Sequence, residues 1–209
     1  MNDPIVFIID DDPSALRGLA RLVRAAGFKV ETFTSAGDFL AFGKLNGPGC
    51  IVLDVRMPEM SGPELQEELD KAEYSMPIVF LSAHADVETT VETMKKGAVD
   101  FLTKPVDRDD LLESIRASLA MDAENRARRA ESSAVQDLLH TLTPRQHEVM
   151  THVIAGMRNK QIAVGLGISE ETVKIHRGRM MQRLGIRSVA ELVRLCEKAG
   201  IAPADPRRS

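Results

Sequence analysis

The chain has 209 residues, of which 44% are hydrophobic and 28% charged, and its formal net charge is −4 at pH 7. This composition is typical of a globular protein that is long enough to hold two domains. Because the sequence has no apolar stretch long enough to cross a membrane, no signal-peptide pattern and only two distant cysteines, we expect a cytoplasmic protein without a membrane partner, a disulfide framework or a cysteine metal cluster.

Two apolar runs near the N-terminus end in aspartates. Residues 5–9 (IVFII) are followed by Asp10, Asp11 and Asp12. Residues 50–53 (CIVL) are followed by Asp54. Continuous apolar runs are typical of strands in a parallel sheet covered on both faces, and ligand sites in such sheets gather at the carboxyl ends of the strands. Carboxylates there repel one another unless a divalent cation binds them, so the pattern predicts a site for a hard cation. Asp12 is expected instead to cap a helix that begins at Pro13.

Two later apolar runs end in other polar residues. Residues 78–81 precede Ser82, and residues 99–103 precede Lys104 and Pro105. The predicted strand ends therefore combine carboxylates with a hydroxyl and an ammonium group. Taken alone, Lys104 is also explained as an exposed turn residue, and Ser82 as a cap at the end of its strand.

Four sequence blocks in this region together resemble the receiver domain of two-component response regulators. They are residues 9–14 (IDDDPS), 53–58 (LDVRMP) followed by Ser61 and Gly62, 82–84 (SAH) and 101–105 (FLTKP), in the order and at the spacing of that family. The resemblance implies an α/β fold with a doubly wound five-stranded parallel sheet of the flavodoxin-like type. It also implies a cis peptide bond between Lys104 and Pro105, which proline permits.

The receiver resemblance assigns a role to each polar residue. It implies that Asp54 is the phosphoacceptor and that Lys104 and Ser82 bind the phosphoryl group. It implies a Mg²⁺ site formed by Asp10, Asp11, Asp54 and the backbone carbonyl of Arg56. The metal and an ammonium group would neutralise the negative charge around a transferring phosphoryl group. The implied phosphoryl source is a cognate histidine kinase, and the only catalysis expected is Mg²⁺-dependent self-phosphorylation from a phosphodonor and self-dephosphorylation.

The resemblance also implies a conformational switch. Ser82 would move toward the phosphoryl group, and the ring of Phe101 would rotate inward behind it. Many relatives carry a tyrosine where this chain has Phe101, so a hydroxyl is missing there. The face that the switch would reshape comprises the segments near Asp86 to Lys96 and Asp107 to Leu119.

Residues 106–143 contain neither glycine nor proline. Apolar residues recur at helical spacing in the first part of this segment, at Leu111, Leu112, Ile115 and Leu119. We therefore expect one long helix that runs to about Leu139, with a frayed linker around Ser132 and Ser133 as the alternative. The expected organisation is a receiver domain at residues 1–120, a helical linker at residues 121–140 and a C-terminal domain at residues 141–209.

The two ends of the chain carry opposite charge. Residues 1–120 hold 12 Lys and Arg against 21 Asp and Glu, whereas residues 141–209 hold 12 against 6. A basic C-terminal domain indicates a nucleic-acid partner. The chain has seven Phe, one Tyr and no Trp, which leaves little surface for stacking single-stranded bases, so duplex DNA is favoured.

The basic region has the capping pattern of short helices. We expect three: one from Pro144 to Gly156 capped by Thr143, one capped by Asn159 that ends near Gly167, and one that starts at Ser169 with Glu170 and Glu171 in its first turn. In the third helix, the apolar residues expected to face a small core are Val173, Ile175, Met180, Met181 and Leu184. The basic residues expected on the remaining surface of the helix are Lys174, His176, Arg177, Arg179 and Arg183. Such a helix fits the major groove of DNA, although solvation alone also explains a charged helix face.

These helices, with a closing helix at residues 188–194, resemble the LuxR-type helix-turn-helix domain, an all-α domain of four helices, over about residues 141–199. With the receiver, the whole chain resembles a FixJ-type response regulator. The resemblance implies base contacts from Lys174 and Ile175 with His176 and Arg177 close by, and phosphate contacts or bracing from Asn159, Lys160 and Arg179. A core or capping role remains an equal alternative for His176. The implied partners are double-stranded promoter DNA, RNA polymerase and, after phosphorylation, a second copy of the chain.

Two other functions compete with this interpretation. A phosphohydrolase of the haloacid-dehalogenase type also forms an aspartyl phosphate at a strand end, but it needs a second acid two residues after the nucleophile, where this chain has Arg56. A regulator whose receiver ignores phosphate and signals through partner contact alone is the other candidate, and the intact acidic cluster counts against it.

Overall fold

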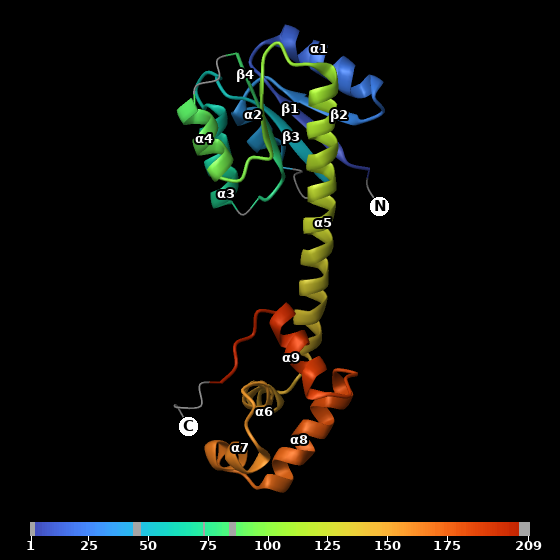
Figure 1. The fold of residues 1–209 in the computed structure, drawn as a ribbon, viewed down its shortest axis with the longest axis vertical. Helices are drawn as coiled ribbons and strands as arrows, with labels where there is room; N and C mark the ends of the chain where they lie inside the picture. The colour runs from blue at the N-terminus through green and yellow to red at the C-terminus, as the bar shows by residue number, and fades with distance from the viewer. Residues whose placement is uncertain (1–2, 44–46, 73, 84–86, 205–209) are drawn as a thin grey trace. The chain divides into compact units, whose positions relative to one another are not determined.

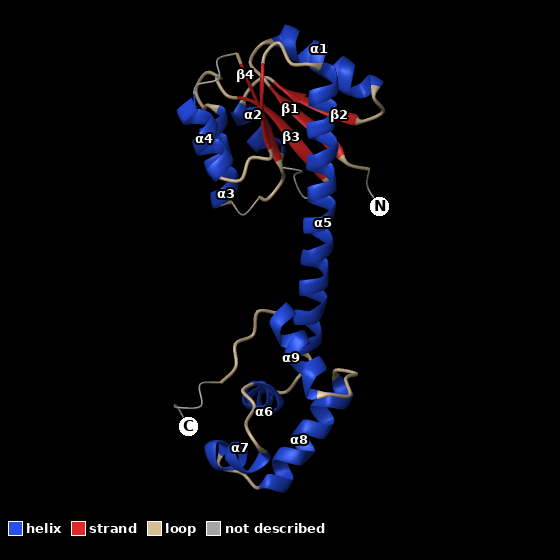
Figure 2. Cartoon of the chain, viewed as in Figure 1, coloured by secondary structure: helices blue, strands red, loops and turns tan. Residues whose placement is uncertain are grey.

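The computed structural model describes residues 3–43, 47–72, 74–83 and 87–204 (Figure 1). The chain divides into two compact units, residues 1–126 and 127–209. All strands among the described residues lie in the first unit, and the second unit is helical (Figure 2). No described helix is both long and apolar enough to cross a membrane. His84 of the third sequence block and Asp86, at the start of a predicted switch segment, lie outside the described residues.

The first unit is built on a five-stranded parallel sheet. Its strands are β1 (Ile5–Ile9), β2 (Lys29–Phe33), β3 (Gly49–Asp54), β4 (Ile78–Ser82) and β5 (Asp100–Thr103), in the spatial order β2-β1-β3-β4-β5. The helices that follow the strands are α1 (Pro13–Ala25), α2 (Ala36–Phe42), α3 (Gly62–Lys71), α4 (Val87–Lys95) and α5 (Arg108–His140). The strand order reverses between β1 and β3, the point at which doubly wound sheets bind ligands. The predicted fold class is confirmed.

Both faces of the sheet are covered, as the continuous apolar runs predict. Alternate residues of β1 pack on opposite faces: Val6 and Ile8 contact a core formed with α1 and α5, whereas Phe7 and Ile9 contact a core formed with α2 and α3. Cys50 is fully buried in β3, as expected for a packing residue. Burial, together with the carboxylate of Asp122, raises the pKa of its thiol to about 12.

Helix α5 is continuous from Arg108 to His140, which confirms the prediction of one long helix. A polar anchor, Asp122 with Arg126, attaches it to the start of β3 beyond Leu119, its last contact with the core that it shares with α1. The Asp122 carboxylate is 2% exposed and accepts hydrogen bonds from the backbone N–H of Gly49 at 3.0 Å and from Nε of Arg126 at 2.7 Å. Arg126 also donates to the carbonyl of Gly47.

The described residues of the second unit form four further helices, α6 (Pro144–Ile154), α7 (Asn159–Leu166), α8 (Glu170–Arg183) and α9 (Val189–Lys198). The buried apolar side chains of these helices and of the end of α5 form one core, which includes Leu139, Val149, Met150, Ile162, Val173, Met180 and Leu192. The predicted caps of α6 and α8 are present, since Thr143 Oγ1 accepts the N–H of Gln146 and Ser169 Oγ accepts the N–H of Thr172. The four-helix prediction is confirmed.

Two local predictions in this unit are wrong. Asn159 does not cap α7: the N-cap is Arg158, whose N–H donates to Oε1 of Gln161 at 2.9 Å. Ile175 does not face the core, because its side chain is 44% exposed while Val173 is buried. Two residues along an α-helix are about 200° apart around its axis, so Val173 and Ile175 point to opposite sides.

Candidate functional site

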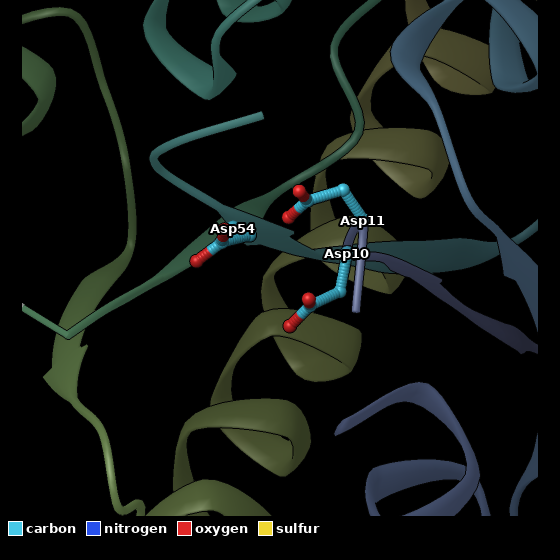
Figure 3. Close-up of side chains that lie close together, drawn as sticks. All are labelled: Asp10, Asp11 and Asp54. Carbon is cyan, nitrogen blue, oxygen red and sulfur yellow. The ribbon is translucent and has the colours of Figure 1, made fainter. Parts of the chain in front are cut away.

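Three carboxylates gather at the point where the strand order reverses. Asp10 and Asp11 follow β1 and Asp54 ends β3, and these two strands are neighbours in register, with Ile9 opposite Leu53. One oxygen from each carboxylate lies within 4.8 Å of the others (Figure 3). Asp10 and Asp54 are buried, and Asp11 is exposed. The predicted acidic cluster is therefore compact, and its two buried carboxylates and one exposed carboxylate form the acidic pocket.

The ammonium group of Lys104 bridges two of these carboxylates. Its Nζ lies 2.7 Å from Oδ2 of Asp10 and 2.8 Å from Oδ1 of Asp54. The backbone supports this placement, because the N–H of Lys104 donates to the carbonyl of Ser82 at 2.8 Å. The peptide bond between Lys104 and Pro105 is cis, as the receiver resemblance implies. Lys104 is thus not an ordinary exposed turn residue.

The charged groups of the pocket have opposing effects on the pKa values of Asp54 and Lys104. Burial raises the pKa of Asp54, and although Lys104 counteracts this, the charges of Asp10 and Asp11 raise the pKa further. Burial by itself would lower the pKa of Lys104, but its hydrogen bonds to Asp10 and Asp54 outweigh that effect and leave the pKa raised. A single ammonium group therefore does not neutralise the three acids.

The pocket has the properties that a magnesium ion requires. Carboxylate oxygens are the hard ligands that Mg²⁺ prefers, and three of them converge from fixed strand ends. A divalent cation there would relieve the repulsion that raises the pKa of Asp54. The donor set of Asp10, Asp11 and Asp54 therefore fits this metal.

Asp54→Asn is expected to raise the free energy of unfolding of the Mg²⁺-free protein at neutral pH. The pKa of Asp54 is raised above its ordinary value of 3.8, so ionisation of this carboxyl destabilises the folded state. Below pH 3.8 both states are protonated and the penalty is absent, whereas it grows as the pH rises toward the folded pKa and is constant above it. The difference in urea unfolding between variant and wild type should widen accordingly, and a difference that is constant over this range would contradict the prediction.

The remaining predicted receiver residues lie in β4, in β5 and just after β3. Ser82 ends β4 opposite Thr103 and is 1% exposed. Phe101 lies opposite Phe80 in the sheet, with their ring centroids 6.3 Å apart, and is half-buried against the core of α2 and α3. The side chain of Arg56 is exposed, two residues after Asp54.

Gly62, the first residue of α3, has a structural role that the sequence pattern did not predict. A Cβ atom at this position would lie 2.4 Å from the backbone oxygen of Asp54 and 2.9 Å from the ring of Phe80. Only glycine permits this approach of α3 to the end of β3. The available signal was a glycine between a serine cap and a proline, where an ordinary helix former would suffice.

In the second unit, α7 and α8 present the predicted nucleic-acid residues. Lys160, Lys174, Ile175 and Arg179 are exposed, whereas Asn159, His176 and Arg177 are half-buried. Nη1 of Arg177 donates to Oδ1 of Asn159 at 2.6 Å, which ties α8 to the start of α7. Lys174 forms an exposed ion pair with Glu171 at 3.2 Å, and such pairs are weak enough to be exchanged for another anion.

Comparison with known proteins identifies a family for each unit. Residues 6–116 match the response regulator receiver domain, and residues 140–196 match the bacterial regulatory proteins of the luxR family. The chain is 41% identical over 194 residues to the response regulator protein TodT of Pseudomonas putida, covering 93% of this chain and 86% of TodT. It is also 41% identical over 200 residues to the transcriptional regulatory protein FixJ of Azorhizobium caulinodans, covering 96% and 95% of the two chains.

A solved structure supports the same relationship. The response regulator StyR superposes with a TM-score of 0.80 at 48% identity, covering 94% of this chain and all of the StyR chain. The two family models each match one unit, and TodT, FixJ and StyR each align with both units. The chain belongs to the two-component response regulators of the FixJ type, with a receiver domain and a LuxR-type DNA-binding domain.

Proposed function

We propose that a histidine kinase phosphorylates Asp54 and that the phosphorylated chain dimerises and regulates transcription at promoter DNA. The observation that supports this most strongly is the buried Asp54 carboxylate at the topological switch point, flanked by Lys104 and by two further acids. In this proposal residues 1–120 receive the signal, residues 121–140 form the linker and residues 141–209 bind DNA. The protein acts in the cytoplasm, with RNA polymerase as its further partner.

The transfer step uses Asp54 as the nucleophile. A carboxylate oxygen of Asp54 forms a bond to the phosphorus of a phosphohistidine, and the phosphorus–nitrogen bond breaks, so that the imidazole departs with the electron pair and is then protonated. Lys104 stabilises the negative oxygens of the transferring group, and the hydroxyl of Ser82 donates a hydrogen bond to one of them once the phosphate is attached. Mg²⁺, when bound by Asp10, Asp11, Asp54 and the backbone carbonyl of Arg56, supplies positive charge beside the same oxygens.

Arg56 also bears on the rival hydrolase. The general acid of a haloacid-dehalogenase-type phosphohydrolase would occupy this position, and the side chain here is an exposed arginine. The chain therefore lacks the acid needed to protonate the leaving group of a phosphate ester. Self-dephosphorylation of Asp54 is the reaction that ends the signal in this proposal.

The DNA face is formed by α8 and the start of α7. Lys174 suits the guanine O6 and N7 atoms in the major groove, and the exposed Ile175 suits a thymine methyl group. Lys160 and Arg179 contact phosphates, while Asn159 positions Arg177 beside the recognition surface. Two such helices in a two-fold dimer would read half-sites one helical turn apart.

The molar mass in solution tests this function. Wild type and Asp54→Ala are measured by light scattering with and without Mg²⁺ plus beryllium fluoride, which mimics an aspartyl phosphate. We expect a shift from monomer to dimer in the wild type only, together with tighter binding to two-fold DNA sites. An unchanged mass and unchanged DNA affinity in both proteins would favour the regulator that ignores phosphate.

Gly178→Ala separates helix stability from DNA contact. A Cβ at this position in α8 meets no heavy atom within 4 Å, so alanine should stabilise the second unit by about 0.5–1 kcal/mol in thermal unfolding. If the glycine lets the α8 backbone approach DNA, the same methyl group should weaken binding about tenfold in fluorescence anisotropy, or about 1.4 kcal/mol. Gly18→Ala in α1 is the control, because its Cβ also meets open space but lies in the receiver. Equal DNA affinities for the two variants would exclude a close approach at Gly178.

A further inference from the structure

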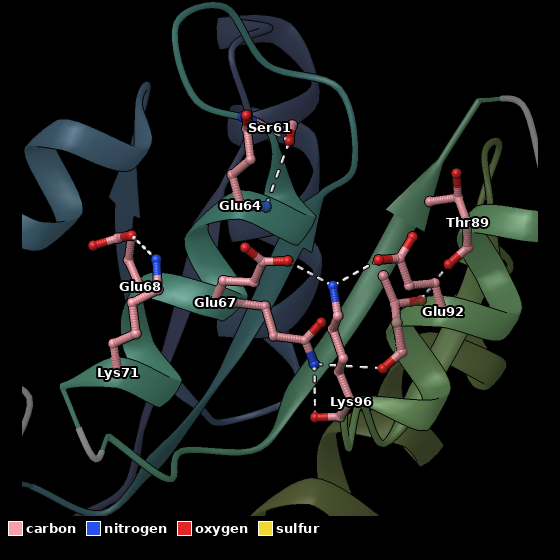
Figure 4. Close-up of polar contacts among 10 residues, drawn as sticks. Ser61, Glu64, Glu67, Glu68, Lys71, Thr89, Glu92 and Lys96 are labelled. Atoms are coloured by element: carbon pink, nitrogen blue, oxygen red, sulfur yellow. Dashed lines mark hydrogen bonds and ion pairs between the residues drawn. The ribbon is translucent and has the colours of Figure 1, made fainter.

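The C-terminal end of α4 is attached to α3 by a buried amide. Nε2 of Gln66 donates to the carbonyls of Thr93 at 3.4 Å and Lys96 at 3.2 Å (Figure 4). Gln66 is 2% exposed. Thr93 lies in the last turn of α4, where its carbonyl also accepts the N–H of Ala98 at 3.1 Å, and Lys96 directly follows the helix. Gln66 thus supplies a cap to α4 from a different helix.

A surface ion pair lies beside this buried cap. Nζ of Lys96 contacts Glu67 of α3 at 2.6 Å and Glu92 of α4 at 2.7 Å (Figure 4). The two side-chain hydrogen bonds raise the pKa of Lys96 to about 12. Glu67 and Gln66 are adjacent residues, so one turn of α3 holds the end of α4 through both a buried and an exposed contact.

The opposite end of α3 is held against the phosphoacceptor strand. The N–H of Gly62 donates to the carbonyl of Val55 at 3.0 Å, and the Cβ-free backbone of Gly62 packs against the oxygen of Asp54. A capping box formed by Ser61 and Glu64 stabilises this first turn. Gln66 follows Gly62 by four residues, or about one helical turn. The backbone beside Asp54 and the end of α4 are therefore connected through a single turn of helix.

Stability alone does not account for Gln66. Among the described residues, no group donates to its buried Oε1 atom. A buried acceptor without a donor is costly, and an apolar side chain would fill the same space without that cost. The amide is explained if its Nε2 has to hold the carbonyls of α4.

Helix α4 is the element that such a link would move. It exposes three apolar side chains, Val87, Val91 and Met94, spaced along one side. A small rotation of α4 changes how these side chains are presented, and packed elements respond to such shifts as units rather than by continuous deformation.

We propose that α3 is a mechanical link from Asp54 to α4, and that Gln66 is the positioning residue that transmits the change. This proposal rests on phosphorylation of Asp54 and adds to it a route that runs through Gly62 and Gln66, separate from Ser82 and Phe101. Displacement of the backbone around Asp54 shifts the first turn of α3. Because Gln66 is hydrogen-bonded to the carbonyl of Thr93 in the last turn of α4 and to that of Lys96 directly after it, that helix follows.

The test measures pocket occupancy and the α4 response separately in the full chain. Fluorine NMR reports beryllium fluoride bound with Mg²⁺ in the acidic pocket, and amide hydrogen exchange reports α4. In wild type we expect beryllium fluoride to change exchange in residues 92–97 by about fivefold or more, the lower range of allosteric coupling. In Gln66→Met the bound fluorine signal should stay within about twofold of wild type while the exchange response is lost.

Two further variants complete the design. Glu67→Gln removes only the exposed ion pair with Lys96, so it retains the fold and should weaken the α4 response partially. Glu68→Gln removes the exposed pair with Lys71, which lies within α3 and does not reach α4, so its response should match wild type. A wild-type α4 response in both Gln66→Met and Glu67→Gln would overturn the link. Absence of bound beryllium fluoride in the wild type would overturn the proposed function, and the link with it.

Discussion

Asp54→Asn is expected to reduce phosphate incorporation from acetyl phosphate and Mg²⁺ to background. The variant keeps the size and the buried location of the side chain, but an amide oxygen is not a nucleophile toward phosphorus, and one ligand charge of the metal site is lost. The mass of the intact chain measures the covalent phosphate directly. The same substitution should also abolish activation of a target promoter under conditions that induce the wild type.

Asp12→Asn is the matched control for this experiment. It makes the same chemical change one residue after Asp11, but Asp12 is an exposed helix cap whose Oδ1 accepts the N–H of Ser14 at 2.7 Å. Asparagine caps helices as well as aspartate does, so α1 should be unaffected. Normal phosphate incorporation in Asp12→Asn with none in Asp54→Asn would place the reaction on Asp54. Residual incorporation in Asp54→Asn would point to another acceptor.

Lys104→Met should lower the free energy of unfolding of the receiver by about 2–4 kcal/mol without Mg²⁺. Methionine preserves the length of the side chain but leaves the buried carboxylates of Asp10 and Asp54 without their cation. Urea unfolding can be followed by the fluorescence of Tyr74, because it is the single tyrosine of a chain without tryptophan and lies in the first unit. Addition of Mg²⁺ should restore part of the loss, since the metal replaces the missing positive charge.

Lys96→Met is the corresponding control. Lys96 also bridges two carboxylates, Glu67 and Glu92, but all three groups are at the surface. Water and salt screen such an arrangement, so its loss should have a much smaller effect that does not respond to Mg²⁺. Equal losses in Lys96→Met and Lys104→Met would contradict the view that burial makes the acidic pocket dependent on its lysine.

The acidic pocket was predictable because its parts lie at strand ends. Apolar runs that end in Asp10 and Asp54 identify two buried parallel strands, and parallel strands place their carboxyl ends at one edge of the sheet. Lys104 directly follows β5, so the family pattern places its side chain at the same edge of the sheet. No contact between distant helices had to be known in advance.

Contacts between helices were not predictable in this way. The bond from Arg177 to Asn159 depends on how α7 and α8 pack, and the link from Gln66 to α4 joins residues 27 and 30 positions apart. The exposure of Ile175 was within reach of the sequence, because its two-residue separation from Val173 excludes a shared helical face. The prediction that Ile175 faces the core followed from its apolar side chain and not from its position in the helix. In a recognition helix an exposed apolar side chain can contact a thymine methyl group.

The polar anchor of α5 determines where the receiver can be joined to a different C-terminal domain. If Asp122 and Arg126 hold the start of β3, a recombination point at residue 120 separates the receiver from the carboxylate that accepts the Gly49 N–H. A crossover after Arg126 transfers the receiver with its anchor complete. Chimeric regulators joined after Arg126 should therefore keep a stable receiver, whereas those joined a helical turn or two earlier should express poorly whatever domain they acquire.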